Sequence, residues 1–349
     1  MRVTVDLGRR AYDVALGAGV RRELAALIQE RAPRAREAVV ITSSSLRAQP
    51  WFDVSTGLEQ HVIEVPDGEA AKNWSTLESL SEELAARRLS RHDVIVGVGG
   101  GAITDLAGFV AGIYLRGIGV VHVPTSLVGQ VDAAIGGKTA VNLRAGKNLV
   151  GAIHQPLGVL CDSEVLATLP ERDRLAGMAE VAKCWLLEDR RASELSSASF
   201  EDLILLAVRL KAGIVMMDET EIGQRALLNY GHTLGHALEI LALGRDRDEL
   251  RHGEAVAIGL GFAVRLAHAM GRVGALEVVN HDEVLAALGL SWRLPGDASI
   301  DALLQAMAHD KKAHHDLTFV LPGAAGFEVV HHVPDALVRD VLERFRGEI

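Results

Sequence analysis

The alternation of apolar and polar positions divides the chain into two parts at about Pro170. Before that point, short β-rich apolar runs alternate with helical stretches, and the runs 37–42 and 93–98 are typical of buried strands. Such alternation is typical of an α/β fold. After Pro170 the apolar positions follow the helical period in the segments 201–218, 223–243, 253–270 and 334–346. The pattern therefore predicts an α/β domain over residues 1–170 and a mainly α-helical domain over residues 171–349.

A glycine-rich turn, 99–101, directly follows the second of these strands. Three glycines let the backbone approach a ligand closely, and the helix predicted after them offers unpaired N–H groups to a pyrophosphate. The spacing is not GxGxxG, so a purely structural turn is an equal alternative for this stretch alone. A further strand, 120–126, ends in hydroxyl residues, while Lys138, Lys147 and Asn148 stand in glycine-rich turns suited to phosphate. These neighbouring features favour a nucleotide-binding site at the glycine turn.

The run Gly137-Lys138-Thr139 does not belong to a P-loop, because GxxxxGK[ST] requires a glycine where Asp132 stands.

A separate feature of the second half is the pair His232 and His236. If this segment is helical, residues four apart share a face, and paired imidazoles indicate a metal site. A core or surface histidine pair is an equal alternative.

Two further stretches carry candidate ligands. Glu180 precedes Lys183 by nearly one helical turn, a spacing that by itself more often gives a solvated salt bridge. His252 opens the run His252-Gly253-Glu254, at the predicted start of a separate helix. Neither stretch identifies a site without its neighbours.

Composition narrows the chemistry. The 349 residues are 49% apolar and 23% charged with a formal net charge of −10, which fits a globular protein and disfavours nucleic acid or a membrane surface as a partner. The two cysteines, Cys161 and Cys184, are too few for a disulfide framework or a cysteine-built zinc site, so a transition metal would use histidine and carboxylate. Residues 1–7 alternate like a strand and no run is apolar enough to span a bilayer. We expect a cytoplasmic protein acting on a small molecule.

Together these stretches resemble the 3-dehydroquinate synthase family of sugar phosphate cyclases, from about Asp67 to Lys312. The resemblance rests on ordered motifs: Asp67-Gly68-Glu69 with Lys72, the run 99–105, Arg116-Gly117, Val123-Pro124-Thr125, Gly136-Gly137-Lys138-Thr139, Gly146-Lys147-Asn148, Ala179-Glu180-Val181, Leu228-Asn229, Gly231-His232-Thr233, Gly235-His236, His252-Gly253-Glu254-Ala255 and Asp310-Lys311-Lys312.

The resemblance implies an N-terminal NAD-binding α/β domain, a C-terminal helical domain, an active site in the cleft between them and a homodimer. It places zinc or cobalt on Glu180, His232 and His252, so that His236 belongs with the substrate instead of the metal. The NAD contacts that it implies are Asp67, Gly68, Glu69, Lys72, Gly101, Ala102, Ile103, Thr104, Asp105, Thr125, Ser126, Lys138, Lys147 and Thr168.

The implied reaction is the one that makes the first carbocycle of the shikimate pathway, in the supply of aromatic amino acids. NAD transiently oxidises C5 of 3-deoxy-D-arabino-heptulosonate 7-phosphate, phosphate leaves, the hydride returns, and an intramolecular aldol step closes the ring. The resemblance assigns Lys138, Asn148 and Lys312 to the phosphate, with Arg116 reaching across the dimer; Lys183, Lys211, Arg225 and Asn229 to the carboxylate and hydroxyls; and Asp132 and His236 to proton transfer, with Lys138 and Lys183 also in catalytic roles.

Several alternatives stay open. The substrate of an aminodehydroquinate synthase carries both the carboxylate and the phosphate, whereas the substrates of other sugar phosphate cyclases lack the carboxylate. A metal-dependent polyol dehydrogenase would release NADH, and a non-catalytic scaffold would only bind a metabolite. Three stretches depart from the commonest family pattern, namely Ala133-Ala134, Cys184-Trp185 and Ala313-His314-His315. They leave the shape of the pocket open more than the class of reaction.

Overall fold

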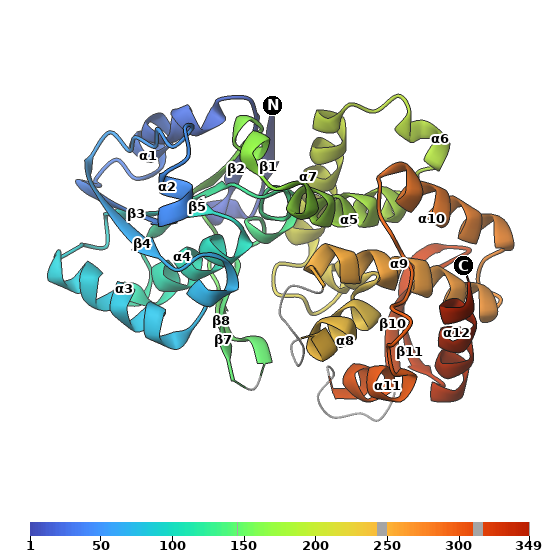
Figure 1. Ribbon diagram of the computed structural model, residues 1–349. Coiled ribbons are helices and arrows are strands. Elements are labelled where there is room, and N and C mark those ends of the chain that lie inside the picture. Colours follow the sequence, from blue (N-terminus) through green and yellow to red (C-terminus); the bar gives the residue numbers. More distant parts are fainter. Residues whose placement is uncertain (145, 243–249, 310–316, 349) are drawn as a thin grey trace. The chain divides into compact units, whose positions relative to one another are not determined.

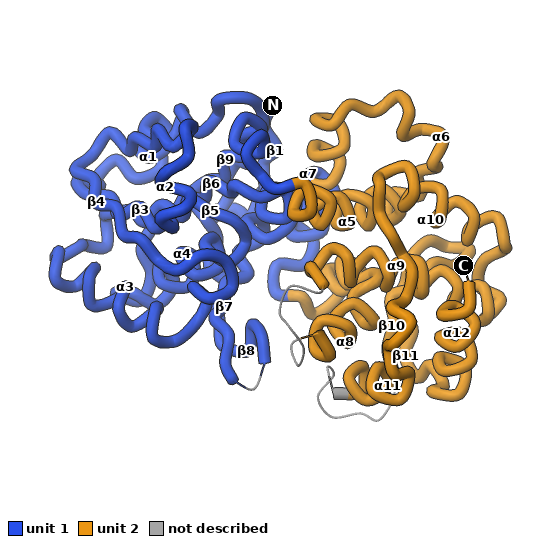
Figure 2. Tube along the Cα trace, in the orientation of Figure 1, with its two compact units in different colours: residues 1–170, 208–220 blue, residues 171–207, 221–349 orange. Residues whose placement is uncertain are grey.

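The computed structural model describes residues 1–144, 146–242, 250–309 and 317–348, and they form two compact units (Figures 1 and 2). The first unit comprises residues 1–170 and 208–220, and the second comprises residues 171–207 and 221–349. The boundary at Pro170 coincides with the change of hydrophobic pattern. The helix α7 (Phe200–Met217) contributes its C-terminal half to the first unit.

The first unit is built on a seven-stranded sheet in the order β1-β2-β9-β6-β5-β3-β4. All neighbouring strands are parallel except β1 and β2. The strands are β1 (Arg2–Val5), β2 (Tyr12–Gly17), β3 (Glu37–Ser43), β4 (Glu59–Val65), β5 (Val94–Gly99), β6 (Gly119–Pro124) and β9 (Gly158–Asp162). The α/β expectation for this half of the chain is confirmed.

Helices cover both faces of this sheet because the central strands are apolar on both sides. Val39 and Ile95 pack into one core cluster with α3 (Trp74–Ala86) and α4 (Gly101–Ile113), whereas Val40 and Val96 pack into another with α1 (Leu24–Arg31). A short helix, α2 (Ser44–Arg47), follows β3. The sheet therefore holds the ends of its strands in fixed positions.

A separate two-stranded hairpin, β7 (Lys138–Leu143) and β8 (Gly146–Ile153), corrects one expectation. Lys147 and Asn148 do not lie in a glycine-rich turn but in β8, and Lys138 begins β7. The glycines before Lys138 do form a turn, since Gly136 and Gly137 have φ values of +93° and +66°. The hydrophobic pattern of the hairpin is weak because most positions of its two strands are exposed or half-buried.

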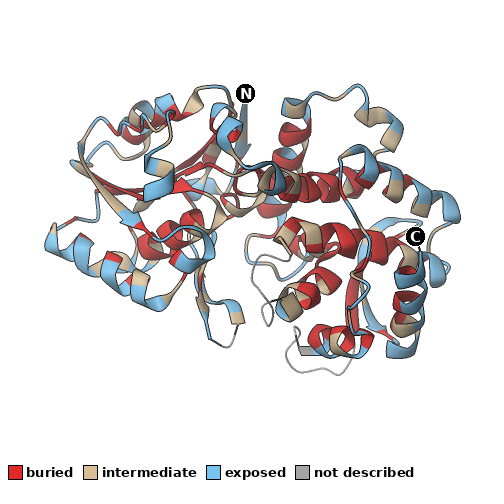
Figure 3. Ribbon diagram, in the orientation of Figure 1, coloured by how far each residue is buried: buried red, intermediate tan, exposed pale blue. Residues whose placement is uncertain are grey.

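The second unit is mainly helical, as expected. Its helices are α5 (Glu171–Leu187), α6 (Ala192–Leu195), the first half of α7, α8 (His232–Ala242), α9 (His252–Ala269), α10 (Ala275–Ala287), α11 (Ile300–His309) and α12 (Asp335–Gly347). The central helix is α9, which packs against α5, α8, α10 and α12 and is buried over most of its length (Figure 3). None of the described helices combines the length and apolar character needed to cross a bilayer.

Two details of this unit differ from the expected pattern. The segment 223–243 is not one helix, because the 3-10 helix Gln224–Asn229 ends at Tyr230 and Gly231 (φ +78°) precedes the start of α8 at His232. A hairpin, β10 (Leu317–Gly323) and β11 (Gly326–Val333), also packs among the helices. Periodicity missed β10 because a short, wholly buried apolar run fits a strand or a helix equally well.

Candidate active site

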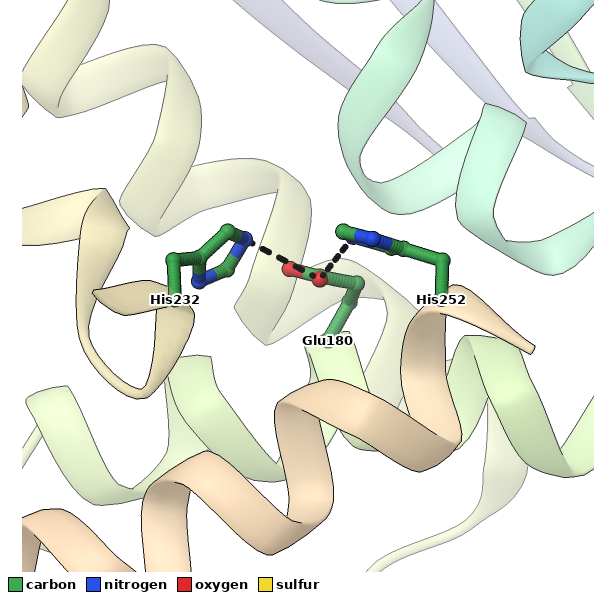
Figure 4. Close-up of side chains that lie close together, drawn as sticks. All are labelled: Glu180, His232 and His252. Atoms are coloured by element: carbon green, nitrogen blue, oxygen red, sulfur yellow. Dashed lines mark hydrogen bonds and ion pairs between the residues drawn. The ribbon is translucent and has the colours of Figure 1, made fainter. Parts of the chain in front are cut away.

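Three side chains of the second unit converge on one point (Figure 4). Glu180, His232 and His252 each offer a ligand atom, and these atoms lie within 4.8 Å of one another. Oε1 of Glu180 is 3.2 Å from Nε2 of His252 and 3.6 Å from Nε2 of His232. One carboxylate and two imidazoles suit zinc or cobalt and leave coordination positions open for a substrate oxygen. The donor set therefore fits the metal that the resemblance implies.

Glycines bring the helices of this cluster together. Gly253 of α9, next to His252, packs directly on the backbone of Ala176 in α5, one turn before Glu180. Gly259 of α9 packs in the same way on Gly231, which precedes His232. Any side chain at Gly253 or Gly259 would overlap backbone atoms of the neighbouring segment. The three ligands consequently reach one point because two helix contacts have no side chains between them.

Charge in the cluster is shared among buried groups. Nζ of Lys183 is 2.5 Å from Oε2 of Glu180, and both side chains are almost fully buried. Burial alone would raise the pKa of Glu180, but the charge of Lys183 and the hydrogen bond from His252 hold it well below its usual range. The surface salt bridge that the Glu180–Lys183 spacing allows is thus replaced by a buried pair.

The two histidines of the cluster differ in electrostatics. Burial and the charge of Lys183 lower the pKa of His232 to about 3. Burial also acts to lower the pKa of His252, but hydrogen bonds to Glu180 and Glu239 outweigh it and raise the value to about 10. In the metal-free protein, His232 is therefore a neutral ligand and His252 carries the proton that a metal ion would displace.

His236 lies beside this cluster and is not among its three ligand groups. Its ring centroid is 5.4 Å from that of His232, at right angles, and its side chain is half-buried on α8. The four-residue spacing thus places both rings on one helix face, as predicted, while the ligand set uses only His232.

In the first unit, residues expected to contact NAD follow the carboxyl ends of parallel strands. Asp67 follows β4, Gly101 follows β5, Thr125 follows β6, and Thr168 lies beyond β9. These ends lie at one edge of the sheet. The chain passes from β3 to β4 on one side and then from β4 back to β5 on the other side of β3, so the strand order reverses between β3 and β5, which is where open α/β sheets bind ligands. The turn after β5 leads into the N-terminus of α4, whose free N–H groups suit a pyrophosphate.

The remaining residues expected at the NAD site are distributed around this edge. Asp67, Gly68 and Glu69 are exposed, Lys147 is exposed on β8, Thr104 and Thr125 are buried, and Gly101, Ala102, Ile103, Asp105 and Ser126 lie at or near the turns after β5 and β6. Thr168 accepts a hydrogen bond from the indole N–H of Trp51 at 2.7 Å.

Buried Lys72 links this edge to the hairpin. Its Nζ donates to Oδ2 of Asp105 and to Oδ1 of Asn148, both at 2.6 Å. Burial raises the pKa of Asp105 to about 6 although Lys72 acts in the opposite direction. A residue expected at the cofactor and one expected at the substrate phosphate therefore share one ammonium group.

Asp132 lies in a π-helical turn, Gly129–Ala133, a local form frequent at functional sites. Nζ of Lys211, on α7, donates to the backbone oxygen of Asp132 at 2.6 Å and also to its carboxylate. Both residues belong to the first unit. Their contact joins a residue expected to transfer protons to one expected to bind substrate.

Lys211, Arg225, Asn229 and His236, which the resemblance assigns to the substrate and to proton transfer, do not lie on one helix. Lys211 lies on α7, Arg225 and Asn229 lie on the 3-10 helix before α8, and His236 lies on α8. Arg225 is almost fully buried, whereas Nδ2 of Asn229 donates to Glu221 at 3.3 Å. The break at Gly231 separates the two segments.

Two further residues of the substrate set stand elsewhere. Arg116 is exposed with a left-handed backbone (φ +66°) in the 3-10 helix Tyr114–Arg116 that follows α4, and Lys138 is exposed at the start of β7. Lys312 and the departure Ala313-His314-His315 lie outside the described residues. The departures Cys184 and Trp185 are both buried in α5.

Sequence reasoning missed two residues. Asn142 of β7 donates from Nδ2 to Glu69 at 2.7 Å and accepts from the backbone N–H of Asn148 at 2.9 Å. Glu239 of α8 accepts from Nδ1 of His252 at 3.1 Å. The helical spacing of Glu239 from His232 and His236, which places the three residues on one face over about two turns, was the available signal.

Comparison with known proteins agrees with this geometry. The family description "3-dehydroquinate synthase N-terminal" matches residues 62–176, and "3-dehydroquinate synthase C-terminal" matches residues 177–313. A protein of Amycolatopsis mediterranei (strain S699), whose name gives aminodehydroquinate synthase as an unproven activity, is 49% identical over 346 residues, 99% of this chain and 95% of its own. The 3-dehydroquinate synthase of Nitrobacter hamburgensis (strain DSM 10229 / NCIMB 13809 / X14) is 42% identical over 368 residues, 98% and 96% of the two chains.

A solved structure extends the comparison. A 2-deoxy-scyllo-inosose synthase complexed with carbaglucose-6-phosphate, NAD⁺ and Co²⁺ superposes with a TM-score of 0.84 at 26% identity, covering 99% of this chain and all of the other. The fold is thus that of the sugar phosphate cyclases. Matched over both of its domains and by relatives above 40% identity, the chain belongs to the 3-dehydroquinate synthase family.

Proposed function

We propose that this protein is an NAD- and metal-dependent cyclase that converts 3-deoxy-D-arabino-heptulosonate 7-phosphate to 3-dehydroquinate and phosphate, and that it acts as a homodimer. The observation that carries the proposal is the cluster of Glu180, His232 and His252 with buried Lys183 against it. A metal site needs only Glu180, His232 and His252. Lys183 is the additional cation beside this site, and a substrate that bears a carboxylate requires such a group.

The two cofactors would occupy the sites described above. NAD would lie at the carboxyl edge of the sheet, on the glycine turn before α4, and zinc or cobalt would lie on Glu180, His232 and His252. When bound, NAD takes up a hydride from C5 and later returns it, while the metal polarises the C5 oxygen. The open coordination positions would let the substrate oxygen reach the ion.

Three cations and one amide would hold the phosphate that is eliminated. Lys138 and Asn148 lie on neighbouring strands of the hairpin, and Asn148 is held by Lys72. Arg116 would reach the site of the partner subunit in a homodimer, and Lys312 would complete the set. Because phosphate leaves as an anion, such donors stabilise charge that grows during elimination.

Buried cations would hold the substrate carboxylate and hydroxyls. Lys183, Lys211 and Arg225 are each at least nine-tenths buried, and Asn229 offers an amide. A buried ammonium or guanidinium binds an anion more strongly than a solvated one, because little water competes. This set favours a substrate with a carboxylate over a plain sugar phosphate.

Proton transfer is assigned to Asp132 and His236. The carboxylate of Asp132 accepts a hydrogen bond from Lys211, which would hold it in place to accept a proton. His236, half-buried beside His232, can exchange a proton with a substrate hydroxyl near the ion. Proton transfer requires only a hydrogen bond to the substrate, so neither side chain has to change its conformation.

Aminodehydroquinate synthase is the second candidate. The observation that favours it is the 49% identity to the Amycolatopsis protein, against 42% to the 3-dehydroquinate synthase of Nitrobacter hamburgensis. The amino analogue of the substrate keeps the carboxylate and phosphate, so the same cations would bind it. The candidates therefore differ in kcat/KM for two substrates and not in mechanism.

The test is to incubate metal-loaded protein with catalytic NAD⁺ and each substrate, and to measure inorganic phosphate, the cyclic product and absorbance of NADH. Phosphate and dehydroquinate in equal amounts, with no net NADH, support the proposal. A higher kcat/KM with the amino analogue favours the second candidate. Stoichiometric NADH would indicate a polyol dehydrogenase, and absence of turnover with metal and NAD bound would indicate a scaffold.

A further inference from the structure

The two histidines of the metal cluster present the same ring nitrogen to Glu180. Nε2 of each faces Oε1 of Glu180, at 3.6 Å for His232 and 3.2 Å for His252. Nδ1 of each is engaged on the opposite side: that of His232 donates to the backbone oxygen of Tyr230 at 3.0 Å, and that of His252 donates to the carboxylate of Glu239 at 3.1 Å. Both rings are therefore held from behind.

An acceptor at Nδ1 controls what a histidine offers to a metal ion. A neutral imidazole carries one N–H and one lone pair, so a proton kept at Nδ1 leaves the lone pair at Nε2. The same hydrogen bond fixes the plane of the ring. We propose that Glu239 and His281 are positioning residues of the metal centre, Glu239 acting on His252 directly and His281 acting on His232 through Tyr230.

Glu239 is placed for this role by α8. Positions 232, 236 and 239 lie on one face of a helix, so a single face carries a metal ligand, the neighbouring histidine and the supporting carboxylate. The Glu239 side chain is only 14% exposed, whereas the carboxylates of most of the surface ion pairs are far more solvated. A buried carboxylate on an imidazole N–H raises the basicity of the ring and so strengthens it as a ligand.

His281 lies on α10 and acts through the buried side chain of Tyr230, which follows the 3-10 helix Gln224–Asn229. The hydroxyl of Tyr230 donates to Nε2 of His281 at 2.8 Å, and Nδ1 of His281 donates to the backbone oxygen of Glu277 at 2.8 Å. The pattern is consistent in direction, because the ring accepts at one nitrogen and donates at the other. Tyr230 and His281 are both fully buried.

The chain fixes the segment that holds His232. Phe327 of β11 packs edge-on against the Tyr230 ring, with centroids 4.8 Å apart, so the ring is held by packing and by its hydroxyl. Tyr230 stands where the 3-10 helix ends, one residue before the left-handed Gly231. Its carbonyl points at His232 only while this turn keeps its conformation, and the bond to His281 restrains the turn.

The test measures the metal ion and not turnover, because the inference rests on the proposed metal binding and not on the choice of substrate. Metal-free protein is titrated with Co²⁺ against a competing chelator, and the visible spectrum of bound Co²⁺ is recorded. We expect Glu239→Leu to weaken Co²⁺ binding by about 10–100-fold and to change the spectrum. Glu239→Gln, whose amide oxygen can still accept the N–H, should recover part of the affinity.

The second arm changes the chain on α10. His281→Leu should weaken Co²⁺ binding and alter its spectrum, by less than Glu239→Leu because it acts through Tyr230. His281→Gln can accept from the Tyr230 hydroxyl and should restore the parent spectrum. Glu283→Gln, exposed on the same helix, is the matched control and should leave both readouts unchanged.

Three outcomes would overturn the proposal. If Glu239→Leu binds Co²⁺ with the affinity and spectrum of the parent, Glu239 is not a positioning residue. The same result for His281→Leu would refute the role of His281. A parent protein that binds no Co²⁺ would refute the metal assignment and this inference together. Failure of the substrate assay with these metal effects intact would instead refute only the reaction, so the two proposals fail separately.

Discussion

Gly253 of α9 lies so close to Ala176 of α5 that a Cβ built on Gly253 would stand 1.8 Å from the Ala176 carbonyl oxygen. Neither backbone atom can move without shifting its helix. Since His252 precedes Gly253 and Glu180 follows Ala176 by one turn, the contact sets the distance between two metal ligands. A packing detail of the second unit therefore decides whether a metal can bind.

Replacing Gly253 by alanine should separate α9 from α5. We expect Gly253→Ala to lower the free energy of unfolding by about 1–3 kcal/mol, as overpacking does, and to weaken Co²⁺ binding at least tenfold. Urea unfolding of metal-free protein and chelator competition measure the two effects. Gly213→Ala is the matched control, because Gly213 also lies within a helix but has open space around its Cβ position, and it should stabilise by about 0.5–1 kcal/mol. Parent-like Co²⁺ affinity in Gly253→Ala would contradict this view of the contact.

Local pattern predicted the glycine turn and the strands β1, β3, β5 and β6, because each depends on a few adjacent residues, whereas β2 and β9 were not identified. The ligand set shows where this stops. Helical spacing alone pairs His232 with His236, and only a tertiary contact brings His252 from the start of another helix to the same point. The resemblance to a family supplied that contact in advance, whereas periodicity could not.

Other features depend on contacts that no sequence window contains. The helix predicted over 223–243 breaks because Gly231 must fit against Gly259 and Leu260 of α9. Asn142 was overlooked because its partners, Glu69 and Asn148, are identified only when the hairpin is folded. An asparagine in a short strand carries no signal of such a role by itself.

The proposed division between His232, His252 and His236 can be tested directly. His232→Ala or His252→Ala should abolish binding of one equivalent of Co²⁺, because each removes one of three ligands. His236→Ala should keep the metal and lose turnover by about 10²–10⁴-fold, the usual contribution of a general acid or base. Exposed His92→Ala is the control for nonspecific binding. Loss of Co²⁺ from His236→Ala would show that the division is wrong.

We predict that Lys183 strengthens the binding of substrate and weakens the binding of the metal ion. Its ammonium lies 2.5 Å from Glu180 and repels a divalent ion on the same carboxylate. We therefore expect Lys183→Met to bind Co²⁺ at least as tightly as the parent, while KM for the carboxylate-bearing substrate rises at least tenfold. Metal-free Lys183→Met should be less stable by on the order of 3 kcal/mol, because a buried charge loses its partner.

The double variant Lys183→Met/Glu180→Gln separates these effects. It removes both charges, so it should regain most of the lost stability in urea unfolding while binding no Co²⁺ tightly. Weaker Co²⁺ binding in the single variant Lys183→Met would instead mean that Lys183 helps to hold Glu180 in its ligand position.

Asp105 should make the stability of the cofactor-free protein depend on pH. Burial raises its pKa from 3.8 to about 6 in the folded protein despite Lys72, so folding favours the protonated form. Its contribution to stability is therefore fully present below about pH 4 and is lost as the pH rises to about 6. The parent should lose on the order of 3 kcal/mol relative to Asp105→Asn between pH 4 and pH 7, since one pKa unit is about 1.4 kcal/mol. Urea unfolding at a series of pH values measures this difference, with exposed Asp6→Asn as the control for loss of a carboxylate. Parallel curves for the parent and Asp105→Asn would show that the pKa of Asp105 is the same in the folded and unfolded protein, and a parent that gains stability as the pH rises would show that Lys72 lowers this pKa.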